Sequence, residues 1–283
     1  MKIYKVTILW GTNGFGKWLA DYALKHFSEH ICLTTTGSKD DNIEAIKDAD
    51  IVIYSVPISK TEEIITETLP YIKAWAIVAD VTSMKKFPSI VMQAREDIIV
   101  IPAHPMFGPY IEQISWQVVI LTAEKKSQES PEYKFLKNFL EMQQAKVHEC
   151  TPEYHDKMMA VVQGLTHFNM FVVWETMKRL GISVQDSLNF VSPIYKLMIS
   201  SVGRYLGQNP KLYADIQMYN DEILPVHEAF LETAKNFHLS VQSKNIQKFC
   251  GDIEEARDFF GHDICQDWQE YTDMIIEMLS KQK

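Results

Sequence analysis

The chain has 283 residues, of which 46% are hydrophobic and 23% are charged, and its formal net charge is −9. This length suits two domains, and the composition is ordinary for a globular protein. The negative charge argues against broad binding to nucleic acid or to an anionic membrane surface. A few cations in a cleft could still bind a small anionic substrate.

The four cysteines, Cys32, Cys150, Cys250 and Cys265, are far apart and form no CxxC pair. This spacing is typical of reduced thiols and predicts neither a disulfide framework nor a metal site. The N-terminus carries no apolar stretch followed by a small-residue cleavage site. No apolar run reaches the roughly 18 residues of a membrane span. We therefore expect a cytoplasmic protein that does not enter a membrane.

The first half alternates short apolar runs with helical patterns. The predicted strands cover residues 6–10, 31–35, 51–55, 76–81 and 98–102. The predicted helices cover residues 15–27, 42–47, 60–69 and 85–95. This alternation is typical of βαβ units and predicts an α/β fold with a Rossmann-type, doubly wound, mostly parallel sheet. Further strands are predicted at 118–122 and 146–148, with a helix over 132–142 between them.

From about residue 150 the pattern becomes entirely helical. Thr151 and Pro152 are typical of a helix N-cap followed by proline at the first helical position. Helical spacing of apolar residues continues to about Gly181, and further helices are predicted over residues 184–206, 212–236, 240–259 and 263–281. We place the domain boundary near Cys150, which gives an α/β domain over 1–150 and an all-α domain over 151–283. The apolar surplus of the helical half predicts a homodimer held by these helices.

A glycine-rich turn follows the first predicted strand and opens the first predicted helix. Its residues are Gly11, Thr12, Asn13, Gly14, Phe15 and Gly16. Small residues let the backbone approach a pyrophosphate, and the helix N-terminus supplies amide donors. Compared with GxGxxG, Asn13 replaces the second glycine and Gly14 stands beside it. The position within the first βαβ unit favours dinucleotide binding over a tight turn without a ligand.

The end of the second strand indicates which dinucleotide binds. An acidic residue there would bind the ribose hydroxyls of NAD, but Thr34, Thr35, Thr36 and Lys39 precede the first carboxylate, Asp40. Hydroxyls and a cation suit a 2′-phosphate, so this loop favours NADP, with Thr35, Thr36 and Lys39 as ligands. The alternative is NAD, with a solvated turn whose partner is Asp40 or the neighbouring Asp41.

Two further segments follow predicted strands at the edge where ligands bind in open α/β sheets. Ser55, Val56 and Pro57 come after the third strand, and Ser55 is a candidate to face the nicotinamide or a catalytic group. His104 follows the strand ending at residue 102, on a loop stiffened by prolines. Its near-neutral pKa would let it take a proton from a hydroxyl during oxidation.

The loop His104-Pro-Met-Phe-Gly-Pro resembles the HPMFGP loop of prephenate dehydrogenases. Other segments match that family in order and spacing: Asp80 to Lys85, His155 to Phe168, Ser192 to Leu197, Val202 to Tyr205 and Leu212 to Ile216. The likeness extends from about residue 5 to about residue 270, so it includes both predicted domains. It implies a dehydrogenase unit alone, without a chorismate mutase segment before it or a regulatory domain after it.

The resemblance implies oxidative decarboxylation of prephenate to 4-hydroxyphenylpyruvate, with hydride transfer to NAD or NADP. Residues 1–150 would bind the dinucleotide, and 151–283 would bind substrate and dimerise. His104 would accept the hydroxyl hydrogen bond, Ser55 would orient His104, and Arg204 would bind the ring carboxylate. The other residues implied to line the substrate cleft are His167, Lys85, Tyr213, Gln163 and Lys196, the last standing where relatives often have arginine.

The residues alone leave alternatives open for several of these roles. A guanidinium suits a carboxylate substrate, but Arg204 could instead form a structural ion pair with Asp215 or Glu175. Gln163 and His167 would share one helix face, whereas His155 would be turned about a third of a circle away and could serve a dimer or helix contact.

Three other functions remain open. Arogenate, which carries an amino group on the side chain, could replace prephenate as the substrate. A two-domain hydroxyacid dehydrogenase would use a lysine such as Lys157 at the start of the long helix. A nicotinamide-sensing regulatory protein would need no histidine at position 104.

Overall fold

The computed structural model describes residues 2–281, and the chain folds into two compact units. The first unit contains the chain up to Gln163 together with Lys211–Ile223, and the second contains Gly164–Pro210 and the chain from Leu224 onward. Cys150 therefore lies inside the first unit, which also includes the helix that follows it. A functional division near Cys150 stays a prediction.

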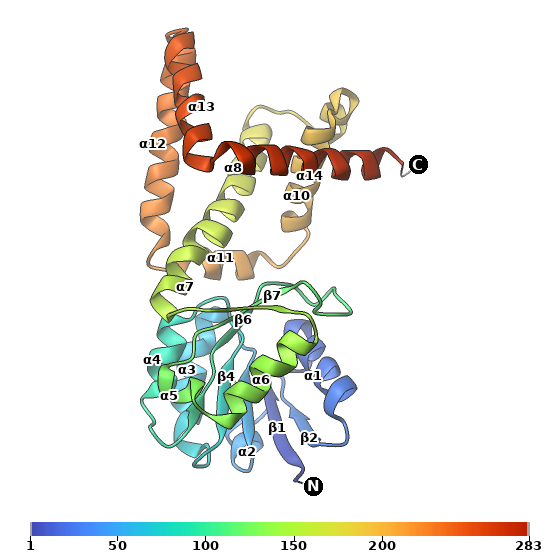
Figure 1. Cartoon of the computed structure of the whole chain (residues 1–283), viewed down its shortest axis with the longest axis vertical. Coiled ribbons are helices and arrows are strands. Elements are labelled where there is room, and N and C mark those ends of the chain that lie inside the picture. Colours follow the sequence, from blue (N-terminus) through green and yellow to red (C-terminus); the bar gives the residue numbers. More distant parts are fainter. Residues whose placement is uncertain (1, 282–283) are drawn as a thin grey trace. The chain divides into compact units, whose positions relative to one another are not determined.

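The first unit is built on a five-stranded parallel sheet with the order β2-β1-β3-β4-β5 (Figure 1). The strands are β1 (Tyr4–Leu9), β2 (Ile31–Thr35), β3 (Ile51–Tyr54), β4 (Ile77–Asp80) and β5 (Ile99–Val100). Strand order reverses between β1 and β3, which makes the crevice beyond their carboxyl ends the expected ligand site. The predicted doubly wound sheet is confirmed, and β2 has the predicted bounds.

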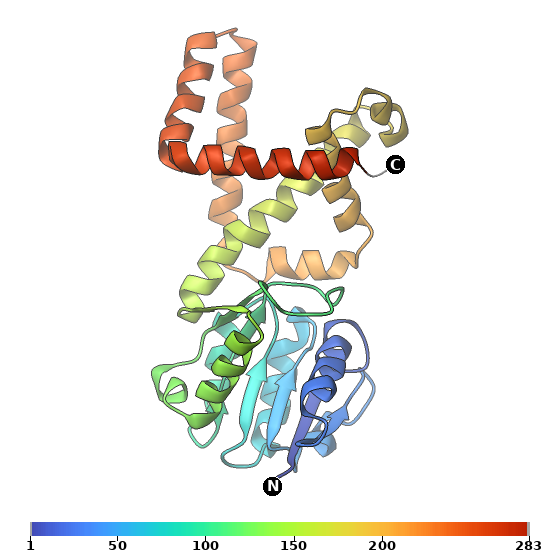
Figure 2. The same cartoon turned by 45° about the vertical axis from the view of Figure 1, so that its right-hand side comes forward.

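Helices cover both faces of this sheet (Figures 1 and 2). They are α1 (Gly14–Phe27), α2 (Asn42–Ile46), α3 (Ile58–Thr68) and α4 (Lys86–Gln93), with a 3₁₀ turn at Leu69–Tyr71. Alternate strand residues point to opposite faces. Val52 and Val78 therefore pack in one core cluster with Ile65 of α3, while Ile8 packs in another with Ala20 of α1.

A second, three-stranded sheet has the order β6-β7-β8. Its strands are β6 (Ala103–Pro105), antiparallel to β7 (Val118–Leu121), and β8 (Lys146–Glu149), parallel to β7. The connection from β7 to β8 carries α5 (Lys125–Gln128) and α6 (Pro131–Met142). The predicted strands at 118–122 and 146–148 are confirmed. The prediction that His104 lies on a loop is wrong, because His104 pairs with Ile120 within β6.

The predicted long helix after residue 150 contains a π-helical segment. Its parts are α7 (Pro152–Met159), the π-helix Ala160–Leu165 and α8 (Thr166–Arg179). The hydroxyl of Thr151 accepts a hydrogen bond from Tyr154 N at 3.2 Å, and Pro152 occupies the first turn, so the predicted cap is confirmed. The π-helix has a wider turn than an α-helix and often marks a functional site.

Several of the remaining helices differ in their bounds from the sequence prediction. They are α9 (Val184–Ser187), a 3₁₀ turn (Leu188–Phe190), α10 (Pro193–Leu206), α11 (Pro210–Met218), α12 (Ile223–Gln242), α13 (Ile246–Phe260) and α14 (His262–Ser280). Ser192 caps α10 and Pro193 fills its first turn, so the predicted helix over 184–206 is interrupted there. The predicted helix over 212–236 likewise divides between α11 and α12.

Aromatic contacts hold the second unit together. Phe168 of α8 stacks on His227 of α12 with ring centroids 3.9 Å apart, and Phe237 of α12 meets Phe249 of α13 edge-on at 5.3 Å. Helices α12 and α13 run side by side (Figures 1 and 2). Within residues 2–281, no helix is long and apolar enough to cross a membrane.

Candidate active site

The glycine turn after β1 has the geometry of a dinucleotide cradle. A Cβ on Gly16 would lie 2.4 Å from the carbonyl oxygen of Trp10, and one on Gly11 would lie 2.8 Å from Thr35 Cγ2, so neither position accepts a side chain. Gly14 has a φ of +53° and no atom within 4 Å of an added Cβ. Asn13, the N-cap residue of α1, makes no side-chain capping bond. The amides of this helix start are therefore available to a pyrophosphate.

The loop after β2 is held by internal hydrogen bonds. The Thr36 hydroxyl is buried, accepts from Trp10 N at 3.2 Å and contacts Asn42 Oδ1 at 3.0 Å. Thr36, predicted as a cofactor ligand, therefore braces the loop with its hydroxyl. Gly37 N donates to Asp40 Oδ2 at 2.6 Å. Lys39 is exposed next to this closed turn.

The segment after β3 lies beside the glycine turn. Ser55 Oγ is 3.0 Å from the position of a Cβ on Gly16, which places this hydroxyl at the predicted cofactor site. Val56 is buried, and Pro57 is the N-cap residue of α3. In the described residues, the side-chain partners of His104 are His155 and Gln163, and Ser55 is not among them. The proposed orienting role of Ser55 stays a prediction.

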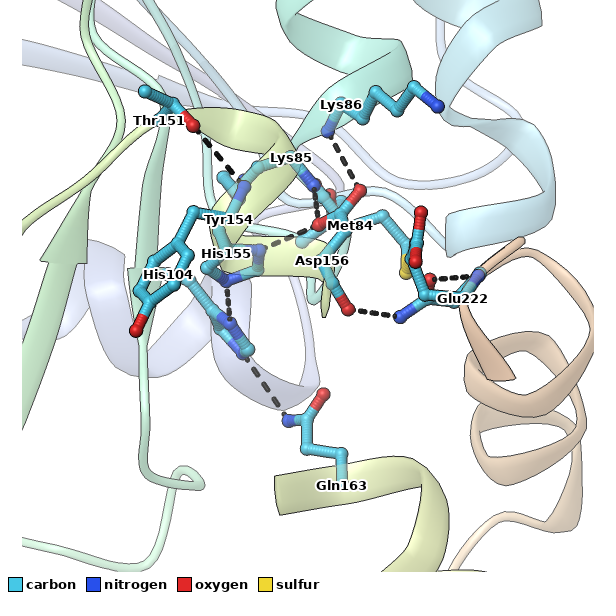
Figure 3. Close-up of polar contacts among 12 residues, drawn as sticks. Met84, Lys85, Lys86, His104, Thr151, Tyr154, His155, Asp156, Gln163 and Glu222 are labelled. Atoms are coloured by element: carbon cyan, nitrogen blue, oxygen red, sulfur yellow. Dashed lines mark hydrogen bonds and ion pairs between the residues drawn. The ribbon is translucent and has the colours of Figure 1, made fainter. Parts of the chain in front are cut away.

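His104 lies almost completely buried at 3% exposure and contacts two residues from the helix after β8 (Figure 3). Its Nδ1 is 2.8 Å from His155 Nε2, and its Nε2 is 3.5 Å from the amide nitrogen of Gln163. Burial lowers the pKa of His104 well below 6.5, and the neighbouring His155 and Lys85 lower it further. The imidazole is therefore neutral at pH 7, as a proton acceptor must be.

The loop that follows β6 is anchored on α1 by aromatic residues. The ring of Phe107 meets Trp18 edge-on at 5.2 Å and Phe15 at 5.9 Å, and Trp18 Nε1 donates to the carbonyl of Ile111 at 2.7 Å. Phe15 belongs to the glycine turn. These contacts therefore connect the histidine strand to the predicted cofactor site.

Asp156 joins α7 to the start of α4. Its two carboxylate oxygens accept from Lys85 N and Lys86 N, each at 2.9 Å, and Oδ1 also lies 2.6 Å from His155 Nδ1 (Figure 3). A carboxylate at a helix N-terminus is stabilised by the free amides there. Asn220 donates to the Asp156 carbonyl at 2.8 Å and so fixes the same turn.

Lys85 forms a buried ion pair with Asp80 at the end of β4. Both side chains have 0% exposure, and Asp80 also accepts from the hydroxyl of Thr82 at 2.7 Å. The resemblance places Lys85 in the substrate cleft. Its ammonium is instead enclosed and paired, so we assign Lys85 to the support of the turn that carries Asp156 and His155.

Replacing Lys85 by methionine is expected to lower the free energy of unfolding by about 3–5 kcal/mol, because it leaves the Asp80 carboxylate buried without a cation. The matched control is Lys60→Met, which breaks the exposed pair with Glu63 and should cost at most about 1 kcal/mol. Urea unfolding of both variants measures the difference. Equal stability of the two variants would show that the buried pair is dispensable.

The other predicted substrate residues divide between the two units. Tyr213 is buried on α11 in the first unit. In the second unit His167 of α8 is buried, its ring 4.9 Å from that of Tyr205, and burial lowers its pKa to about 4. His167 is therefore neutral at pH 7 and would bind a substrate as a hydrogen-bonding group. Lys196 and Arg204 are exposed on α10.

The two carboxylates considered as structural partners of Arg204 have other partners. Asp215 accepts from Ser59 Oγ at 2.9 Å and pairs with Lys211 at 2.9 Å. Glu175 pairs with Arg179 at 3.1 Å and also with Lys178. Because the Arg204 side chain is exposed, it needs no buried anion, and its role in substrate binding stays a prediction.

Sequence reasoning missed three members of this cluster as site residues. The sequence gives Asp156 and Asp80 no predicted role of their own, and it predicts a dimer or helix contact for His155. The adjacent pair His155-Asp156 directly after the helix cap was the available signal. The geometry shows that the His155 side chain contacts His104 on β6 and that Asp156 contacts His155 in turn.

Two family models match the chain. One, described as the prephenate dehydrogenase nucleotide-binding domain, matches residues 20–149, and the other, described as the prephenate dehydrogenase dimerization domain, matches residues 151–255. The chain belongs to the prephenate dehydrogenase family. The resemblance of the HPMFGP loop and of the helical half is therefore confirmed, as is the nucleotide-binding character of the first half.

Individual members of the prephenate dehydrogenase family give the extent of the likeness. The chain is 40% identical over 272 residues to the probable arogenate/prephenate dehydrogenase of Methanocaldococcus jannaschii, a match covering 90% of this chain and 61% of that relative. It is 31% identical over 259 residues to the T-protein of Haemophilus influenzae, covering 92% of this chain and 68% of that relative. The chain thus spans about three fifths of the length of the first of these relatives.

Solved structures of the family share the fold. Prephenate dehydrogenase from A. aeolicus, in complex with hydroxyphenyl propionate and NAD+, matches with a TM-score of 0.69 and 19% identity, covering 91% of this chain and 97% of that chain. Synechocystis arogenate dehydrogenase matches with a TM-score of 0.63 and 18% identity, covering 91% of this chain and 100% of that chain. At these identities the likeness concerns the fold.

Proposed function

We propose that this chain catalyses the oxidative decarboxylation of prephenate to 4-hydroxyphenylpyruvate with NAD or NADP. The observation that carries the proposal is His104, a buried neutral imidazole whose Nε2 has, within the described part of the chain, a single long contact of 3.5 Å with Gln163. A contact of this length is weak, so a substrate hydroxyl can replace it. The family membership and the names of the relatives, arogenate/prephenate dehydrogenase among them, supply the substrate class.

The chemistry requires one proton acceptor and one hydride acceptor. An oxidised nicotinamide held at the glycine turn would supply the second, as acceptor of the hydride from the carbon that bears the hydroxyl. His104 Nε2 takes the hydroxyl proton as the carbonyl forms. Loss of carbon dioxide then leaves the electron pair of the broken carbon–carbon bond in the ring, which becomes aromatic. The resulting phenolate oxygen recovers the proton from His104.

The first unit offers a place for the cofactor. Gly11, Gly14 and Gly16 keep the start of α1 open to a pyrophosphate, and Ser55 stands beside them. Val56 and Pro57 continue the same edge after β3. We infer that NADP is preferred, because Lys39 and its neighbouring hydroxyls suit a 2′-phosphate, while Asp40 is engaged in closing the turn through Gly37 N.

Lys39→Ala is therefore expected to lower the ratio of kcat/KM for NADP over that for NAD by about ten- to a hundredfold, the worth of a charge-assisted hydrogen bond. Steady-state kinetics with both cofactors measure this ratio. The control is Lys47→Ala, since Lys47 is the C-cap residue of α2 and is paired with Glu44. A native protein that uses NAD better than NADP contradicts the preference, and Asp40 would then be the expected ribose ligand.

Prephenate is favoured over arogenate and over simple hydroxyacids by the placement of two charged residues. Arogenate carries an ammonium that would need a carboxylate, and the Asp215 carboxylate is already paired with Lys211 and Ser59. Lys157, which a hydroxyacid dehydrogenase would use, is exposed, whereas its neighbours His155 and Asp156 are buried. Comparing kcat/KM for prephenate, arogenate and a 3-hydroxyacid tests this choice. Preference for either of the other two substrates would reject it.

The chain is expected to be a homodimer through its helices after Cys150, because residues 151–255 match the family's dimerization domain. Leu231 and Ile253 are apolar and exposed there, at 57% and 44%. Changing both to aspartate should weaken the dimer at least about tenfold, since charges are costly in an apolar interface. Sedimentation at micromolar concentration measures the dissociation constant of the dimer. Phe135→Asp, on the exposed face of α6, is the control, and a monomeric native chain would contradict the proposal.

A further inference from the structure

Three side chains of the first unit form a continuous hydrogen-bonded chain that ends at His104 (Figure 3). Asp156 Oδ1 lies 2.6 Å from His155 Nδ1, and His155 Nε2 lies 2.8 Å from His104 Nδ1. Their exposures are 2%, 1% and 3%. On the far side of His104, the partner of Nε2 among residues 2–281 is the side-chain amide of Gln163.

The donor and acceptor in each of these hydrogen bonds follow from the carboxylate of Asp156, which can only accept. Asp156 accepts two backbone N–H bonds from the first turn of α4, which stabilise its ionised form. An ionised carboxylate is only an acceptor, so the proton between Asp156 and His155 belongs to His155 Nδ1. A neutral His155 then presents a lone pair at Nε2. Two lone pairs do not face each other at 2.8 Å, so His104 Nδ1 carries its own proton.

We propose that His155 and Asp156 are positioning residues that hold the proton of His104 on Nδ1 and leave Nε2 as the acceptor of the substrate hydroxyl. The catalytic consequence of this inference rests on the proposed function. The tautomer of His104 is a property of the protein without substrate and can be observed there. The same chain stabilises the imidazolium that forms when His104 takes the proton, because the Asp156 carboxylate balances its charge through His155.

The burial of Asp156, His155 and His104 agrees with the proton balance of the reaction. Prephenate with two carboxylates and the oxidised cofactor gives a monocarboxylate, carbon dioxide and the reduced cofactor, with no proton released. The proton that leaves the hydroxyl is the one that the phenolate oxygen needs after carbon dioxide departs. His104 therefore has to hold that proton between the two steps and return it, and it needs no path to solvent.

The neutral state of both rings is supported by their surroundings. Burial lowers the pKa of His155 against the opposing effect of Asp156, and the nearby Lys85 ammonium disfavours a further positive charge. Lys85 is itself paired with Asp80 and buried. Because Asp80 is already paired with Lys85, Asp156 is the anion that would balance the positive charge of a protonated His104.

The first test reads the tautomer directly in the free protein. Imidazole ¹⁵N spectra of protein labelled in its nine histidines distinguish a protonated from an unprotonated ring nitrogen, and spectra of His104→Asn and His155→Gln assign the two rings. We expect both His104 and His155 to carry the proton on Nδ1 at pH 7. A proton on His104 Nε2 in the native protein would overturn the proposal. This test uses no substrate, so its failure is separate from failure of the proposed function.

The second test compares two amides at position 155. A glutamine amide reaches the place of the His155 Nε2 and can accept from His104 Nδ1, whereas an asparagine amide reaches only the place of Nδ1 near Asp156. His155→Gln should therefore keep kcat within about tenfold of the native value. His155→Asn should lose about a hundredfold, the lower end of a general-base contribution, with little change in KM. Equal losses in both variants, or losses in KM alone, would mean that His155 only packs and would overturn the proposal.

Discussion

Replacing His104 by asparagine is expected to lower kcat by about 10²–10⁴, with little change in KM. The asparagine amide occupies the place of the ring Nδ1 and keeps the contact with His155 Nε2, which measures 2.8 Å in the native protein. Only the acceptor at Nε2 is lost. The substrate hydroxyl becomes acidic as the hydride leaves, so this acceptor acts mainly in the transition state.

Steady-state kinetics at saturating cofactor separate the two parameters for the asparagine variant. Gln163→Leu, which removes the weak 3.5 Å neighbour of the same ring nitrogen, serves as a comparison and should reduce kcat far less. A His104→Asn variant with near-native kcat and a steeply raised KM would show that the histidine binds substrate and does not take its proton. The mechanism proposed above would then be wrong.

Replacing Arg204 by leucine is expected to raise KM by about ten- to a hundredfold, since a charge-assisted hydrogen bond contributes roughly 1.5–3 kcal/mol. The ring carboxylate is present in the bound substrate as well as in the transition state, so kcat should fall less than in His104→Asn. Some loss of kcat is expected, because the placement of the carboxylate also prepares the ring for loss of carbon dioxide.

The matched control for this variant is Arg179→Leu. Arg179 is exposed like Arg204, lies in the same unit, and pairs with Glu175 at 3.1 Å. It should leave both kinetic parameters within about twofold, because surface ion pairs contribute little. If Arg204→Leu behaves like Arg179→Leu, Arg204 does not bind the substrate carboxylate.

Elements with strong local signals could be predicted from the sequence. The alternation of β-branched runs and helical patterns predicted the doubly wound sheet, because helices cover both faces of a parallel sheet and its strands tend to read as apolar runs. The caps at Thr151 and Pro152 were predictable because their side chains act on the adjacent turn. The HPMFGP loop led to the family for a similar reason, since its motif is contiguous.

The elements that the sequence did not predict depend on contacts between distant residues or on departures from ideal helix geometry, which local patterns do not show. Strand β6 has three residues, includes Pro105 and forms through antiparallel pairing with β7, a contact that its own short sequence does not announce. Ser192-Pro193 is a helix cap of the same kind as Thr151-Pro152. The helical spacing of apolar residues continues across it, so the sequence predicts one uninterrupted helix there. The π-helix Ala160–Leu165 changes the turn length, so ideal helical rotation gave no reliable orientation for Gln163 and His155.

The support of His104 could not be predicted for a different reason. Asp156 is 71 residues from Lys85, whose backbone amide it accepts, and His155 is 51 residues from His104. Each pair is brought together by the packing of α7 against α4 and β6, which no spacing along the chain encodes. The resemblance included Lys85 among the substrate residues, and the fold shows that its ammonium is buried against Asp80.

The most direct test of the proposed function is the stoichiometry of the reaction with prephenate. Purified protein, prephenate and either NADP or NAD would be followed for reduced cofactor by absorbance, for 4-hydroxyphenylpyruvate by chromatography and for carbon dioxide release. We predict one of each per turnover. Cofactor reduction without carbon dioxide release, or no reduction with either cofactor, would contradict the assignment of this chain as a prephenate-oxidising decarboxylase.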